Sequence, residues 1–117
     1  MNYIDGFVAA VPNANREQYQ LHAEKSAVLF KEFGALRVVE CWGTDVPEGK
    51  LTSFSMAVQR TDTESVVFSW IEWPSREVRD AAWEKLMQDE RMNPATNPMP
   101  FDGKRMIYGG FQAILTA

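Results

Sequence analysis

The residues best suited to chemistry are three carboxylates, each inside a run of residues that is typical of a β-strand. They are Asp5, Glu40 and Glu72. Acid–base catalysis needs carboxyl groups held at a defined separation, and neighbouring strands of one sheet can provide it. Side-chain alternation places Tyr108 and Gln112 on the same predicted face. The candidate catalytic residues are therefore Glu40, Glu72 and Tyr108. The alternative is that the carboxylates form ion pairs with Arg37, Lys104 or Arg105, or line a hydrated subunit interface.

The same predicted face carries aromatic and cationic side chains that would suit a ligand. Trp42 and Trp70 could stack on a planar molecule, and packing in the core or at a dimer interface is the alternative. Arg105 could orient an anionic group, or it could protect an exposed sheet edge together with Lys104. The predicted ligand-binding residues are Tyr3, Asp5, Trp42, Trp70, Arg105 and Gln112.

The sequence contains one histidine and one cysteine, and neither has a partner at a spacing that is typical of a metal site. His22 lies on the flank of a predicted apolar helix stripe, where a partly buried structural histidine is the simplest interpretation. Cys41 is predicted to face the helices, where buried thiols are usually unreactive. No metal or other cofactor is expected from these patterns.

Six segments are predicted to position these residues. Asn15 and Gln18 resemble a capping box that begins a helix, Gly34 would end that helix, and Ser75 would begin a second one. In chain order the segments are a strand over 3–11, a helix over 15–33, a strand over 36–42, a strand over 66–73, a helix over 75–88 and a strand over 106–115. The 51–59 stretch fits either a short strand or one helical turn.

This βαββαβ order predicts a single α+β domain over residues 1–117. Its expected core is one antiparallel four-stranded sheet in the order 4-1-3-2, with both helices on one face. The small residues Ile4, Gly6, Val8 and Ala10 are expected beneath the helices. The other face would then be large and aromatic, and monomers seldom leave such a patch in water. A second copy packed sheet to sheet is the simplest cover, so we expect a homodimer.

Composition excludes several classes of partner. The net charge is −4, the pI is about 5.0 and no stretch is strongly basic, which argues against binding to nucleic acid or to an anionic membrane surface. No segment approaches the roughly 20 apolar residues that a membrane span needs. A single cysteine and the absence of a readable secretory signal predict a cytoplasmic protein.

Three longer stretches carry a family resemblance. They are FGALRVVECWGTDVPEGKLTSF at 33–54, VVFSWIEWPSR at 66–76 and MPFDGKRMIYGGF at 99–111. They resemble the bacterial YbaA-like family, which has no known function. The resemblance implies a dimeric α+β barrel, in which ferredoxin-like subunits form homodimers through facing sheets. It supplies no established activity, substrate or catalytic residue, and the wider superfamily includes cofactor-free monooxygenases, dehydratases, isomerases and haem-handling proteins.

Two hypotheses about function follow. In the first, the chain binds or transforms a small aromatic or anionic molecule in a cavity lined by the predicted large, aromatic face of the sheet, which we call the mixed face because it also carries acidic and amide side chains. In the second, that face is simply the core of a dimer, and the protein is a non-catalytic binding or interaction domain. The lining residues under the first hypothesis are Tyr3, Asp5, Glu40, Trp42, Trp70, Glu72, Tyr108 and Gln112.

Overall fold

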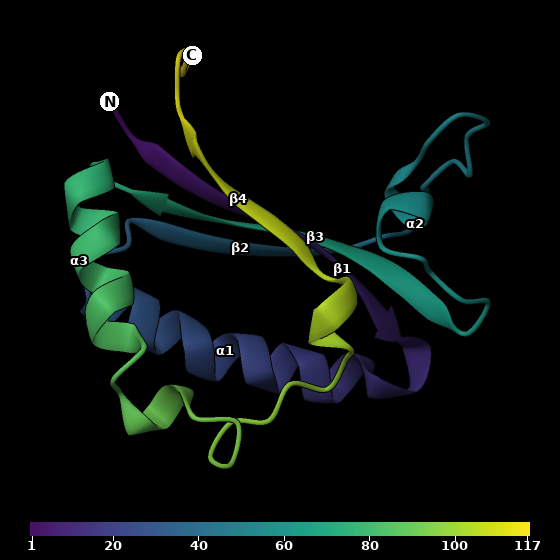
Figure 1. Ribbon diagram of the computed structural model, residues 1–117, viewed down its shortest axis with the longest axis horizontal. Helices are drawn as coiled ribbons and strands as arrows, with labels where there is room; N and C mark the ends of the chain where they lie inside the picture. Colours follow the sequence, from purple (N-terminus) through teal and green to yellow (C-terminus); the bar gives the residue numbers. More distant parts are fainter.

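The computed structural model describes residues 1–117 as a four-stranded antiparallel sheet with two long helices on one side (Figure 1). The strands are β1 (Tyr3–Pro12), β2 (Arg37–Trp42), β3 (Glu64–Trp73) and β4 (Ile107–Gln112). They are rich in aromatic and β-branched residues, which favour extended backbone. Their order is β2-β3-β1-β4, so the predicted 4-1-3-2 topology is confirmed.

The helices that cover the sheet are α1 (Arg16–Glu32) and α3 (Arg76–Leu86). α1 buries Tyr19, Ala23 and Ser26, which recur at helical spacing on its sheet-facing side. Ser75 caps α3 as expected, because its Oγ accepts a hydrogen bond from the Val78 N–H at 3.2 Å.

The expected capping box at Asn15 is wrong. Asn15 does precede α1, after the short 3₁₀ turn η1 (Asn13–Asn15), but its side chain makes no capping bond. Its amide instead donates to the carbonyl oxygen of Pro100 at 2.8 Å. A tertiary contact has therefore replaced the local one, and it ties the start of α1 to a segment near the other end of the chain.

Two connections complete the fold. Residues 43–63 contain the short helix α2 (Phe54–Ala57), so the ambiguous 51–59 stretch is a helical turn. Figure 1 shows α2 on the side of the sheet opposite α1. Residues 87–106, which we call the strap, carry the 3₁₀ turns η2 (Glu90–Met92) and η3 (Gly103–Arg105). The strap runs along α1 and leads into β4 (Figure 1).

The pairing register corrects the predicted composition of the sheet faces. Residues directly opposite each other project to the same side of a sheet. Gly6 lies opposite Trp70, and Ile4 lies opposite Glu72, so these side chains share the face away from α1 and α3, which we call the open face. The expectation that the small side of β1 lies beneath the helices is wrong for all four residues, Ile4, Gly6, Val8 and Ala10.

The large side chains of β1 point to the helices instead. Tyr3 and Phe7 pack against the core cluster that contains Leu29 of α1 and Trp73. Most of the residues assigned to the mixed face therefore lie on the helix side: Tyr3, Asp5, Glu40, Trp42, Tyr108 and Gln112. Cys41 is exposed on the open face rather than buried under the helices. No helix combines the length and apolar character that crossing a bilayer requires.

Candidate functional site

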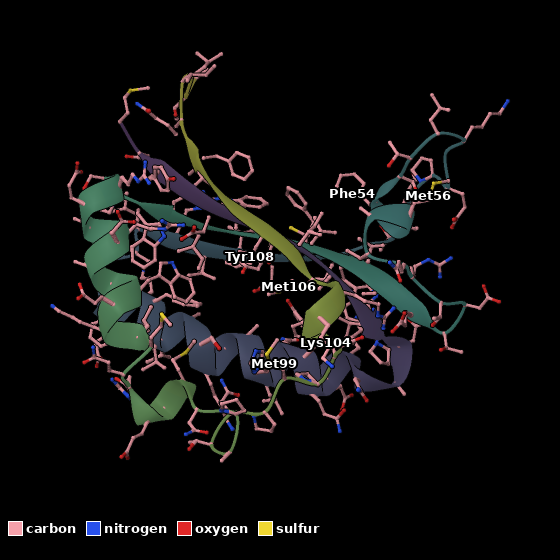
Figure 2. The ribbon with its side chains drawn as sticks, viewed as in Figure 1. Phe54, Met56, Met99, Lys104, Met106 and Tyr108 are labelled. Carbon is pink, nitrogen blue, oxygen red and sulfur yellow. The ribbon has the colours of Figure 1, made fainter.

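A cavity of about 280 Å³ lies between the sheet and α1, where the strap closes one side. Figure 2 shows Met99 and Met106 in the space between the sheet and α1, well away from Phe54 and Met56 on α2. Most of the lining is apolar: Phe7, Ala9, Ala23, Phe30, Ile71, Trp83, Met92, Met99, Phe101 and Met106. Aromatic rings and flexible methionines make a wall that can adapt to a flat, apolar molecule.

One polar pair on the cavity wall joins α1 to β2. The hydroxyl of Tyr19 donates to Oε1 of Glu40 at 2.6 Å. Glu40 is on an edge strand and is exposed as a residue, but its carboxylate reaches inward to the buried tyrosine. Burial raises the pKa of Tyr19 and also raises the pKa of Glu40, although hydrogen bonds from Tyr19 and Ser69 act in the opposite direction on Glu40. Tyr19 is thus a protonated donor at neutral pH.

A second polar group on the wall consists of His22, Asn97 and Ser26. The amide of the buried Asn97 donates to Ser26 Oγ at 3.2 Å, so its Oδ1 faces Nδ1 of His22 at 3.0 Å. This assignment places the imidazole proton on Nδ1 and leaves Nε2 as a hydrogen-bond acceptor. Burial lowers the pKa of His22, which keeps the ring neutral at pH 7. His22 is partly buried, as expected, but it also contributes to the cavity.

Asp5 has a structural role, because its carboxylate is buried and fully hydrogen-bonded. It is 4% exposed, and its carboxylate accepts hydrogen bonds from Trp73 Nε1 at 2.9 Å and Trp83 Nε1 at 2.8 Å. Arg79 adds an ion pair at 2.8 Å. This network joins β1, β3 and α3, and a buried charge that is satisfied in this way holds elements together. Tyr3 stacks beside it, with the Arg79 guanidinium 5.2 Å from the ring centroid.

The three predicted carboxylates do not form one catalytic group. Glu72 is on the open face, where it accepts from Trp70 Nε1 at 3.0 Å and pairs with Arg37 at 3.1 Å. The sheet separates it from Glu40. Tyr108 is on the helix side of edge strand β4 and is 74% exposed. Of the proposed catalytic residues, the structure brings only Glu40 to the cavity.

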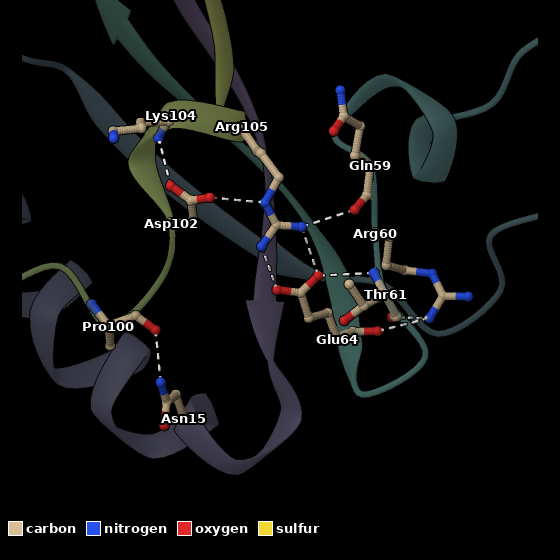
Figure 3. Close-up of polar contacts among 9 residues, drawn as sticks. All are labelled: Asn15, Gln59, Arg60, Thr61, Glu64, Pro100, Asp102, Lys104 and Arg105. Atoms are coloured by element: carbon tan, nitrogen blue, oxygen red, sulfur yellow. Dashed lines mark hydrogen bonds and ion pairs between the residues drawn. The ribbon is translucent and has the colours of Figure 1, made fainter.

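The predicted anion-orienting residue, Arg105, is occupied by other parts of the chain (Figure 3). Its guanidinium binds Glu64 at 2.9 and 2.6 Å, Asp102 at 3.0 Å and the carbonyl oxygen of Gln59 at 2.8 Å. The hydrogen bonds from Arg105 lower the pKa of Glu64 to about 2. Lys104 points away from this cluster (Figure 3). Arg105 therefore anchors the strap, and its contacts do not favour capture of an external anion.

Of the other predicted ligand residues, Trp70 also contributes to the lining of the cavity, whereas Trp42 and Gln112 lie outside it. Trp42 lies under the Arg16 guanidinium, 5.1 Å from the ring centroid. It lines a separate groove between α1 and β2, of about 590 Å³, which we call the outer groove. Gln112 lies opposite Tyr3 near the end of β4 and is exposed.

Sequence patterns did not point to most of the cavity. Tyr19 could have been found, since it is the one hydroxyl-bearing aromatic residue on the predicted apolar stripe of α1. Asn97 carries no such signal, because it lies in a polar, proline-rich stretch that was predicted only as a loop.

The open face is the second concave, apolar surface. It holds a broad depression of about 790 Å³ lined largely by Ile4, Val8, Phe68, Trp70, Ile107 and Phe111. The Phe111 ring lies against Gly6 and Gly109, where an added Cβ would stand 3.5 and 3.4 Å from it. At the other end of the open face, Val58, which follows α2, packs on Val8, Ala10 and Val66.

Solved structures with the same arrangement confirm the ferredoxin-like fold. The chain is similar to a dimeric ferredoxin-like protein from an uncultured marine organism, with a TM-score of 0.66 and 12% identity over 99% of this chain and 98% of that one. It is also similar to a variant of SnoaB, a cofactor-independent oxygenase from Streptomyces nogalater, with a TM-score of 0.60 and 14% identity over 98% and 95% of the two chains.

Sequence comparison gives the family. The chain is 62% identical over 115 residues to the uncharacterised protein YbaA of Escherichia coli, covering 98% of both chains, and equally similar to YbaA of Shigella flexneri. The model of a protein family of unknown function, DUF1428, matches residues 2–103. The resemblance found in the sequence is thereby confirmed, and the chain belongs to the YbaA-like DUF1428 family.

Proposed function

We propose that this protein is a homodimer that binds a small, neutral, aromatic molecule in the cavity between the sheet and α1. The main support is the cavity itself, which combines an aromatic and methionine-rich wall with two hydrogen-bonded polar groups. Small-molecule sites typically have this composition, with a few polar groups fixing the orientation of a mostly apolar ligand. Its volume of about 280 Å³ suits a ligand of one or two fused rings.

The charge of the lining favours a neutral ligand over the anion that was one of the sequence-based alternatives. No lysine or arginine lines the cavity, and His22 is neutral at pH 7. A carboxylate or phosphate placed there would lose its hydration without gaining a counter-charge, which is costly in an apolar site. A ligand carbonyl can instead accept a hydrogen bond from the Tyr19 hydroxyl, and a ligand hydroxyl can donate to Glu40 or to Nε2 of His22.

The homodimer is proposed from the open face. Phe68, Ile107 and Phe111 leave much of their side chains in water there, and a second copy would cover them. One structural neighbour is itself described as a dimeric ferredoxin-like protein. We place the protein in the cytoplasm because its lone cysteine is unpaired and exposed, which suits a reducing compartment.

The alternative function, a non-catalytic interaction domain, is favoured by one observation. The open face is the larger apolar depression, and it requires no ligand if a partner fills it. Only the first function predicts that a small molecule binds in the cavity, so a binding experiment that maps the site separates the two.

The experiment titrates ¹⁵N-labelled protein with indole and with 2-indanone and follows backbone amide shifts. We expect the changes to cluster at α1, Asn97 and Phe101. Ala23→Phe, which places a ring in the cavity, should weaken binding by about tenfold or more. Ala27→Phe, one turn later, lines only the outer groove and should bind as the wild type does. Shift changes confined to the open face, or equal binding by both variants, would refute the proposed cavity function.

A further inference from the structure

We propose that Tyr19 and Glu40 form an acid–base pair that enolises a carbonyl compound bound in the cavity. This inference rests on the proposed function, because it needs a ligand beside the pair. It assigns an activity, proton transfer at carbon, and a ligand class, neutral aromatic compounds that carry a C–H bond next to a ketone.

Glu40 differs from every other carboxylate on the sheet strands. Asp5 is paired with Arg79, Glu64 with Arg105 and Glu72 with Arg37. Glu40 has no cation within ion-pair distance, and its inward contact is the neutral hydroxyl of Tyr19. An arginine stabilises a carboxylate and makes it a weaker base, whereas an unpaired carboxylate in a partly buried site keeps its basicity. Ion pairs that link parts of the fold therefore account for three of the four carboxylates on the strands, and no such pair accounts for Glu40.

The position of the pair suits exchange of protons with water. Tyr19, Ala23 and Glu40 line both the cavity and the outer groove, so the pair forms part of the wall between the two. One side faces the aromatic interior, and the other faces a groove of about 590 Å³ that is open to solvent. A proton taken from a ligand inside can thus leave Glu40 through the outer groove.

The chemical step balances without an oxidant or a cofactor. A Glu40 oxygen takes the proton from the carbon next to the carbonyl, and the electron pair of that C–H bond becomes the carbon–carbon double bond of an enolate. The Tyr19 hydroxyl, released from Glu40, donates to the enolate oxygen and stabilises the charge that develops there. Return of a proton from Glu40 to the same carbon restores the ketone, and return to another carbon would isomerise a suitable ligand.

The test measures hydrogen–deuterium exchange at the α-carbons of 2-indanone in D₂O by ¹H NMR. With the wild-type protein we expect exchange about 100-fold faster than in buffer alone, a typical gain from a positioned general base. Glu40→Gln should reduce the rate to that of buffer, and Tyr19→Phe should reduce it by about tenfold. Glu72→Gln is the matched control, because this carboxylate lies on the open face and should leave the rate unchanged.

Binding is measured separately, so the two proposals fail in different ways. If 2-indanone and indole bind in the cavity but exchange is not accelerated, or if Glu40→Gln is as active as the wild type, the acid–base pair is refuted and the binding function stands. If neither molecule binds, both proposals fall. Glu40→Ala with added formate provides a second check, since a small carboxylate should restore exchange only if Glu40 acts as the base.

Discussion

The Arg105 guanidinium binds three separate parts of the chain, and this single residue explains how the strap is held. Its partners are Glu64 at the start of β3, Asp102 in the strap and the Gln59 carbonyl after α2 (Figure 3). Paired hydrogen bonds between a guanidinium and a carboxylate are among the strongest polar contacts in proteins. Because Glu64 is buried, its charge depends on Arg105 for compensation.

Glu64→Gln should lower the free energy of unfolding at pH 7 by about 1.5–3 kcal/mol, the usual contribution of a hydrogen bond to a charged group. The effect has a defined pH dependence, because the folded-state pKa of about 2 is below the ordinary glutamate value. The stabilisation is therefore full above about pH 5 and declines as the pH falls towards about 2. Urea denaturation of both proteins across this range measures it.

The control for this prediction is Glu48→Gln. Glu48 also pairs with an arginine, Arg60, but its side chain is 67% exposed, and exposed pairs contribute little. We expect its unfolding curve to match the wild type at every pH. A loss in Glu64→Gln that is the same at pH 7 and near pH 2 would show that the effect is not due to the ionised carboxylate.

The roles of Asp5 and Glu64 could not be predicted from the sequence because their partners are distant in it, whereas the pairing of Glu72 with Arg37 was one of the alternatives considered. Asp5 and Arg79 are 74 positions apart, and Glu64 and Arg105 are 41 apart. The sequence did indicate Asp5, Glu40 and Glu72 as candidate functional residues. It could not show that Glu40 alone lacks an arginine, since that depends on which side chains the fold brings together.

At the scale of the elements, the order and types of the strands and helices were predictable, but the facing of the strands was not. Alternation divides each strand into two sets of side chains and does not say which set meets the helices. We expected the smaller side chains of β1 to lie under α1, because close packing of a helix on a sheet favours small residues between them. The structure instead directs Phe7 towards α1 beside a cavity, and places Gly6 beneath Phe111 on the open face.

The two adjacent glycines of β4, Gly109 and Gly110, face opposite sides of the sheet and have different surroundings. A Cβ on Gly110 would stand 2.5 Å from the Tyr3 hydroxyl oxygen and 2.9 Å from Nη2 of Arg79, which is fixed by Asp5. A Cβ on Gly109 would make an ordinary contact with the Phe111 ring at 3.4 Å. Of these two glycines, only Gly110 lacks room for a side chain.

Gly110→Ala should be less stable than the wild type by about 1–3 kcal/mol, the usual cost of overpacking, because Tyr3 and Arg79 must move. Gly109→Ala is the matched control and should change stability by less than about 1 kcal/mol. Thermal unfolding followed by circular dichroism compares them. If the two variants melt together, the contacts of Gly110 with Tyr3 and Arg79 do not constrain β4.

At the scale of the whole molecule, the cavity and the open face lie on opposite sides of one sheet. The strap and α1 enclose the first, and nothing in the chain covers most of the second. The proposed ligand binding and the proposed association of two copies would therefore use separate surfaces. A homodimer formed through the open face should leave the cavity accessible in each subunit, which is consistent with both parts of the proposed function.

Phe111→Asp should convert the proposed homodimer into a monomer. Phe111 is 61% exposed on the open face of edge strand β4, and a charge there would be buried without a partner in a sheet-to-sheet interface. Light scattering at micromolar concentration should give twice 13.3 kDa for the wild type and 13.3 kDa for the variant. Val28→Asp is the control, since Val28 is 64% exposed on the outer side of α1 and should leave the mass unchanged.

The same variant tests whether the two surfaces are independent. Because Phe111 does not line the cavity, monomeric Phe111→Asp should still bind indole with an affinity within about threefold of the wild type, a difference of under about 1 kcal/mol. A wild-type protein that is monomeric at micromolar concentration would refute the homodimer. A monomeric variant that no longer binds indole would instead show that the cavity requires the second subunit, and the ligand site would then belong to the dimer as a whole.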